Sequence, residues 1–133
     1  MLSDNFFDIQ SFTLDESVAT QLKFQVVVLL DASHPVYRGH FPGNPVVPGV
    51  CQVQMVKELV EKAVGHSLTL FESDNIKFLS MINPLVNPEL EFDILIRPVS
   101  DQEVSVTASI GCGASVFLKF KGKFESAGSC RKN

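Results

Sequence analysis

The chain has 133 residues, of which 45% are hydrophobic and 20% are charged, and these values predict a single globular domain. A chain of this length can bury roughly two-thirds of its unfolded surface, so it needs neither a disulfide nor a metal to hold a core. Eleven Lys and Arg residues against fifteen Asp and Glu residues give a formal net charge of −4. This balance argues against the broad basic face with which nucleic-acid-binding proteins neutralise phosphates.

Cysteine usage and the N-terminal sequence indicate the compartment. Cys51, Cys112 and Cys130 are odd in number and none belongs to a CxxC pair, so we expect neither a disulfide framework nor a zinc site. No basic residue precedes Lys23, and the longest all-apolar run covers only residues 26–30. Both observations argue against a secretory signal and a membrane-spanning helix. We therefore expect a soluble cytoplasmic protein that makes no membrane contact.

The first element predicted along the chain is a strand over residues 22–30. Its sequence, LKFQVVVLL, carries apolar residues on both alternating faces, as in a strand that is covered on most of both sides. The next segment, residues 31–49, contains four prolines and three glycines. Because proline fixes φ and removes an N–H donor, this density disfavours regular structure and predicts a shaped loop.

A single helix is predicted over residues 50–64, and Gly65 is a suitable stop. The apolar residues within one arc of its helical wheel are Val53, Val56, Leu59, Val60, Ala63 and Val64. Gln54, Glu58 and Glu61 occupy the other side. The helix is therefore expected to bury one face and to expose its polar residues.

Four further strands are predicted from runs of β-branched and aromatic residues separated by short turns. These runs cover residues 75–83, 90–99, 103–110 and 114–124. One helix among consecutive antiparallel strands predicts an α+β domain in which a curled antiparallel sheet covers one central helix. We assign residues 1–125 to this single domain and residues 126–133, which lack periodicity, to a loose tail.

The segment just before the helix carries the chemistry. It places His40 in a loop stiffened by three prolines, ahead of a helix whose first free N–H groups are expected near residues 49–51. Glycine at positions 43 and 49 permits close approach of a ligand to the backbone, because there is no Cβ to collide with it. A base and an anion site are thus expected side by side.

The run GHFPGNPVVPGV, residues 39–50, resembles the signature HFPGxPxxPGV of the hot-dog-fold (3R)-hydroxyacyl-acyl-carrier-protein dehydratases of fatty acid biosynthesis. The resemblance implies the hot-dog fold, in which a curled antiparallel sheet wraps one central helix. It also implies dehydration of (3R)-3-hydroxyacyl thioesters, carried on acyl carrier protein, to trans-2-enoyl thioesters. No metal or redox cofactor is implied. The family builds its site between two subunits, so a homodimer or a dimer-based oligomer is expected.

The resemblance also implies roles for individual residues. His40 would remove the proton α to the thioester carbonyl, and the backbone N–H of Gly49 would polarise that carbonyl. Preorganised N–H donors at a helix N-terminus stabilise the enolate charge that develops in such a step. Phe41, Gly43 and Val50 would complete the substrate-binding surface.

Gln54 departs from the family pattern, which has Glu or Asp at this position, and we pair it with His40 as the second catalytic residue. A neutral amide can hydrogen-bond the β-hydroxyl or a water, but it cannot supply a proton to the leaving hydroxide. One interpretation is that His40 carries the proton from Cα to the oxygen. Another is a noncatalytic or half-catalytic acyl-binding subunit. Glu58, one turn further on, is either a replacement acid or a solvated residue. A thioesterase is disfavoured by the HFPGxPxxPG loop.

Three alternating lysines, a cysteine and two histidines lie outside the motif. Lys119, Lys121 and Lys123 alternate with apolar residues, and they form either a solvent face or a docking strip for an acidic carrier protein. Cys51 is expected to be a small packed residue. His34 and His66 are expected to be neither catalytic nor metal-binding. In the predicted dimer, Gln54 would face the partner's His40.

Overall fold

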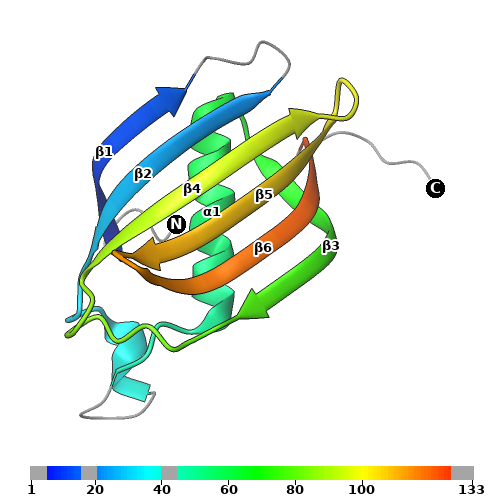
Figure 1. The fold of residues 1–133 in the computed structure, drawn as a ribbon. Coiled ribbons are helices and arrows are strands. Elements are labelled where there is room, and N and C mark those ends of the chain that lie inside the picture. The colour runs from blue at the N-terminus through cyan, green and yellow to red at the C-terminus, as the bar shows by residue number, and fades with distance from the viewer. Residues whose placement is uncertain (1–5, 16–20, 40–44, 127–133) are drawn as a thin grey trace.

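The computed structural model describes residues 6–15, 21–39 and 45–126. In these ranges it contains one α-helix, one 3₁₀ helix and six strands, whose bounds are β1 (Phe7–Asp15), β2 (Leu22–Leu30), η2 (Pro35–Gly39), α1 (Gly49–Val64), β3 (Leu68–Phe78), β4 (Glu89–Pro98), β5 (Glu103–Cys112) and β6 (Ser115–Ser126). The strands form one antiparallel sheet in the order β1-β2-β4-β5-β6-β3. The sheet curls around α1 (Figure 1). The predicted hot-dog architecture is confirmed.

The inner face of the sheet and the covered part of α1 make one apolar core. Apolar side chains alternate with exposed ones along the central strands, as a period of two requires when one face is buried. The core members on β2, β4 and α1 are Phe24, Val26, Val28, Leu30, Leu90, Phe92, Ile94, Ile96, Cys51, Met55, Val56, Leu59 and Val60. Residues 22–30 form a strand as predicted, but the prediction that both of its faces are covered was wrong, because only alternate residues are buried. The strands predicted at 90–99, 103–110 and 114–124 are present within two residues of their observed bounds.

Two predictions about the edges of the sheet were wrong. The strand over residues 22–30 is the second strand, because β1 precedes it and pairs with it from Phe7↔Leu30 to Asp15↔Lys23. The strand predicted over residues 75–83 is β3, which begins seven residues earlier and ends at Phe78. Both are edge strands. In each, only the first residue is buried, so neither shows the alternation by which strands are recognised.

The predicted loop over residues 31–49 also differs from the structure in part. Residues 35–39 form a short 3₁₀ helix, with a proline at its first position, where the missing N–H removes no helical hydrogen bond. Tyr37 is buried and its ring stacks on Phe6 at a centroid distance of 5.9 Å. This contact joins the loop to the core.

The predicted exposure of Glu58 was wrong. Glu58 is only 5% exposed, and Gln52 is only 3% exposed. The sheet covers more than one arc of the helix, because it curls around α1 rather than lying flat against one side (Figure 1). Val53, placed in the predicted apolar arc, is only partly buried.

The C-terminal strand continues one residue into the predicted tail. Ser126 ends β6, and its N–H donates to the carbonyl of Gln102 at 2.9 Å. Residues 127–133, the rest of that tail, lie outside the described residues, so the domain bounds stay a prediction. Among the helices in the described ranges, none combines the length and apolarity required to cross a membrane.

Candidate active site

The N-terminal end of α1 is held in place by the segment before it. Pro48 is the N-cap residue in an extended conformation, with φ −60° and ψ 146°. Its carbonyl accepts the N–H groups of Cys51 and Gln52 at 3.0 and 3.1 Å. Val47 donates its N–H to the carbonyl of Ile82 at 2.8 Å and accepts a hydrogen bond from Gln52 Nε2 at 3.2 Å. These hydrogen bonds hold the start of α1 against residues 47–48 and, through Val47, against Ile82.

Two N–H groups at this helix end are candidates for binding a ligand. Of the three predicted donors, the N–H of Cys51 is used by Pro48. Gly49 and Val50 occupy the first two helical positions, whose N–H groups have no partner within the helix. No side chain caps this helix end in the described part of the chain. The positive end of the helix dipole is thus available to an oxyanion at Gly49 and Val50.

A cavity of about 560 Å³ opens at this end of the helix, and we call it the helix-end cavity. It is lined by Gly49, Val50, Val53, Gln54, Lys57, Leu70, Ile76, Phe78 and Phe124. The structure therefore brings three of the predicted site residues, Gly49, Val50 and Gln54, to one cavity. The other lining side chains are apolar except for Lys57. Such a lining suits an acyl chain whose polar end reaches the helix terminus.

Phe78 lies directly against Gly49. A Cβ built on Gly49 would be 2.8 Å from the Cζ atom of Phe78, closer than carbon atoms pack. The ring of Phe78 is 52% exposed. Sequence reasoning assigned Phe78 only to a strand, since a lone aromatic residue does not indicate which helix terminus it will contact.

The other predicted site residues, His40, Phe41 and Gly43, lie outside the described residues. Their positions relative to Gln54 stay predictions. The flanking segments are described on both sides, at η2 and at residues 45–48. In the sequence, His40 directly follows the 3₁₀ helix.

Gln54 and Glu58 form a polar pair along α1. Gln54 Nε2 donates a hydrogen bond to Glu58 Oε2 at 2.9 Å. Both residues line a second cavity of about 640 Å³, which we call the flank cavity, beside the C-terminal half of α1 and the start of β1 and β3. Gln54 lines both cavities, whereas Glu58 lines only the flank cavity. Sequence reasoning placed Glu58 at the right helical spacing but did not predict its burial.

The remaining reactive side chains near the helix start are unsuited to nucleophilic chemistry. Burial raises the pKa of the Cys51 thiol, and burial, followed by the charges of Cys51 and Asp31, raises the pKa of Tyr37. Both groups are therefore neutral at pH 7. The prediction that Cys51 is a packed residue is confirmed by its exposure of 9%. His34 Nδ1 accepts the N–H of Val36 at 3.1 Å, within its own turn.

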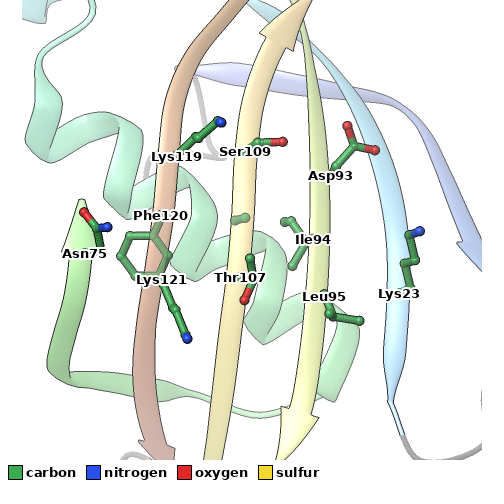
Figure 2. Close-up of a pocket in the computed structure, with 11 residues that line it drawn as sticks. Lys23, Asn75, Asp93, Ile94, Leu95, Thr107, Ser109, Lys119, Phe120 and Lys121 are labelled. Atoms are coloured by element: carbon green, nitrogen blue, oxygen red, sulfur yellow. The ribbon is translucent and has the colours of Figure 1, made fainter. Parts of the chain in front are cut away.

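The predicted lysine strip lies on the outer face of the sheet. Lys119 and Lys121 are exposed there, while Lys123 forms an ion pair with Glu72 at 3.3 Å. A hollow of about 380 Å³, the outer-face hollow, is lined by residues of β2 to β6: Lys23, Asn75, Asp93, Ile94, Leu95, Thr107, Ala108, Ser109, Lys119, Phe120 and Lys121. Figure 2 shows these side chains spread over adjacent strands. Within the described residues, no three His, Cys, Asp or Glu side chains group as a metal site.

A family model and curated relatives both identify dehydratases among the proteins similar to this chain. A model of the ApeI-like family, described as ApeI dehydratase, matches residues 12–116. The chain is 36% identical over 93 residues to the 3-hydroxyacyl-acyl-carrier-protein dehydratase FabZ of Caulobacter sp. strain K31, a match that covers 68% of this chain and 51% of that relative. The chain spans about half the length of the curated relatives it matches.

Solved structures share the fold. An uncharacterized protein of Erwinia carotovora subsp. atroseptica is 20% identical, with a TM-score of 0.65 and coverage of 90% of this chain and 94% of that one. The dehydratase heterocomplex ApeI:P of Xenorhabdus doucetiae provides a chain that is 17% identical, with a TM-score of 0.59 and coverage of 89% and 96%. At these identities the likeness supports the hot-dog fold alone.

Proposed function

This chain belongs to the ApeI-like dehydratase family, and we propose that it dehydrates (3R)-3-hydroxyacyl thioesters to trans-2-enoyl thioesters, with acyl carrier protein as the carrier. The observation that supports this most directly is the helix-end cavity. It combines uncapped N–H groups at Gly49 and Val50, the amide of Gln54 and an apolar lining. The name of the FabZ relative, a 3-hydroxyacyl-acyl-carrier-protein dehydratase, supports the same reaction class. A cytoplasmic location stays a prediction from the cysteine pattern.

The proposed reaction uses His40 as the base. His40 takes the proton from Cα, and the charge that develops on the thioester oxygen is stabilised by the N–H of Gly49. The C–O bond at Cβ then breaks and the Cα–Cβ double bond forms. Because Gln54 has no proton to give, the proton on His40 passes to the departing hydroxide, which leaves as water. Phe41 and Gly43 complete the substrate-binding surface in this proposal.

The proposed enzyme is a homodimer or a dimer-based oligomer in which Gln54 of one subunit faces the partner's His40. β3 is an edge strand, and an unpaired edge of this length is a template for pairing with another chain. Apolar side chains are exposed around it and in the turn that follows: Val50, Phe78, Leu79, Met81, Leu85 and Val86. Sedimentation of a dilute sample as a stable monomer would contradict the dimer.

A panel assay tests the proposed function. The pure protein is incubated with 3-hydroxyacyl thioesters of several chain lengths, on acyl carrier protein and on pantetheine, and enoyl formation is measured. We expect turnover by the parent, and a loss of about 10²-fold or more in His40→Ala, because a positioned acid–base group contributes that much. Equal turnover by the parent and a folded His40→Ala variant would refute the assignment of the base.

The second candidate is a noncatalytic or half-catalytic acyl-binding subunit. The specific observation that favours it is the amide at position 54, where the resembled family has an acid. In this case the pure chain binds acyl thioesters but forms no enoyl product until a second subunit with the missing carboxylate is added. The same panel assay separates the two candidates.

A further inference from the structure

The Gln54 amide has one defined orientation. Its Nε2 donates to Glu58 Oε2 at 2.9 Å, and Glu58 is 5% exposed. A carboxylate oxygen can only accept hydrogen bonds, so it selects the N–H side of the neighbouring amide. In the planar amide, Oε1 and Nε2 lie on opposite sides of the side-chain axis. With Nε2 directed at Glu58, Oε1 is directed away from it.

Gln54 stands at the boundary between the two cavities. It lines the helix-end cavity together with Gly49 and Val50, and it lines the flank cavity together with Glu58. The hydrogen bond to Glu58 therefore uses the polar atom on the flank side. The polar atom left for the helix-end cavity is Oε1, which is an acceptor.

We propose that Glu58 is a positioning residue: its carboxylate holds the Gln54 amide so that Oε1 accepts a hydrogen bond from the hydroxyl of a 3-hydroxyacyl group bound in the helix-end cavity. This inference rests on the proposed function, and it concerns recognition of the hydroxyl. No proton is transferred to or from Gln54. If the Glu58 carboxylate is replaced by a group that cannot accept a hydrogen bond, the Gln54 amide is free to rotate. Either its NH₂ group or its Oε1 can then face the helix-end cavity.

The inference makes the two residues one functional unit. Removing either partner should abolish the preference for the hydroxyl, and removing both should cost no more than removing one, because contacting residues are not additive. Glu61 provides a matched control on the same helix. It lines the flank cavity as well, but its carboxylate forms an ion pair with Lys57 Nζ at 3.4 Å and accepts a hydrogen bond from the N–H of Leu68 at 2.8 Å.

The test measures binding in chains that also carry His40→Ala, so that no substrate is consumed. The ligands are a 3-hydroxyacyl pantetheine thioester and the saturated acyl thioester of the same length, titrated calorimetrically. We expect the parent background to bind the hydroxylated ligand about tenfold more tightly, the value of one good hydrogen bond. In Glu58→Met, Gln54→Ala and their double variant, we expect the ratio of the two affinities to fall to about one.

Two further variants keep the test decisive. Glu61→Met should retain the full preference. Glu58→Gln keeps the shape of the native side chain, and its amide presents an acceptor to Gln54 in one of two orientations. We therefore expect an intermediate preference for the hydroxylated ligand. This variant also serves if Glu58→Met fails to fold. Full preference in folded Glu58→Met or Glu58→Gln would overturn the inference, as would loss of the preference in Glu61→Met.

The outcomes also separate the inference from the proposed function. A hydroxyl preference that depends on Glu58, in a protein whose parent chain forms no enoyl product, would support the inference and refute dehydration. Enoyl formation by a parent chain whose background shows no hydroxyl preference would support dehydration and overturn the inference. Failure to bind either thioester would overturn both.

Discussion

The helix-end cavity and the outer-face hollow both adjoin β3 and β6, but they hold their polar groups differently. In the helix-end cavity, the N–H groups of Gly49 and Val50 are held in place by the first turn of α1, which is closed by hydrogen bonds to the Pro48 carbonyl, and the Gln54 amide is held by the buried carboxylate of Glu58. In the outer-face hollow, the lysine side chains are exposed, and within the described ranges Lys23, Lys119 and Lys121 form no ion pair. Fixed dipoles stabilise developing charge, whereas mobile exposed charges are screened by water and salt.

The largest expected effect comes from exchanging the polar pair. Gln54→Glu alone places two carboxylates within hydrogen-bond distance, which raises the pKa of one of them and disturbs the site. The double exchange Gln54→Glu with Glu58→Gln instead supplies the carboxylate of the family pattern together with an amide donor. We expect the double variant to form enoyl product up to about 10²-fold faster than the parent, and the single variant to be slower than the double. Steady-state turnover checks this order.

If the single and double variants have equal turnover, Gln54 and Glu58 do not act as a unit. The difference drawn between the fixed polar groups of the helix-end cavity and the mobile ones of the outer-face hollow is then weakened. Glu61→Gln is the control, since it changes a carboxylate of the same helix that does not contact Gln54. Its turnover should match that of the parent.

A smaller effect is expected from Gly49→Ala. The added methyl would meet the ring of Phe78 at 2.8 Å, so this ring, which lines the helix-end cavity, must shift. We expect kcat/KM to fall by about tenfold, because misplacement near the reacting groups is costly. Phe78→Ala in the same chain removes the contacted ring and should restore part of the rate. No recovery in a folded double variant would mean that Gly49 acts through something other than this contact.

Alkaline pH tests the buried groups beside the helix start. Burial raises the pKa of Cys51 above its ordinary value of 9.0 in the folded chain, so the folded state retains a proton that the unfolded state loses. The contribution of the neutral Cys51 thiol to the stability of the folded state is complete below pH 9 and is lost as the pH rises through the pKa of Cys51 in the folded state. We expect the free energy of unfolding to decline over this range, and to decline less steeply in Cys51→Ala. Urea titrations at several pH values give the slopes, and identical slopes would contradict the assignment.

The smallest effect is expected at the outer-face hollow. Lys119→Glu with Lys121→Glu reverses two exposed charges, and we expect kcat/KM for pantetheine and carrier thioesters to change by less than about twofold, because exposed charges are screened. The pantetheine thioester, which carries no protein to dock, is the internal control. A loss confined to the carrier-bound substrate would identify this face as the docking strip for the acidic carrier.

Local pattern predicted those elements whose burial follows one simple period. The later strands alternate apolar and polar positions, and residues 22–30 form an apolar-rich run, so the existence of these strands could be read directly from the chain. The edge strands could not, since β1 and β3 each bury only their first residue. In β1, a bulge between Ile9 and Ser11 shifts the alternation of apolar residues by one position. β3 pairs with β6, and a neighbour that is distant in sequence leaves no local signal.

By itself, the amino-acid sequence determined the motif before the helix, the position of Gln54 in place of an acid, and the family to which the chain is similar. Only the tertiary structure decided that Glu58 is buried, that its carboxylate sets the orientation of Gln54, and that Phe78 covers Gly49. The physical reason is that helical periodicity specifies which residues share a face but not how many faces are covered. That number depends on how far a sheet built from distant segments curls around the helix.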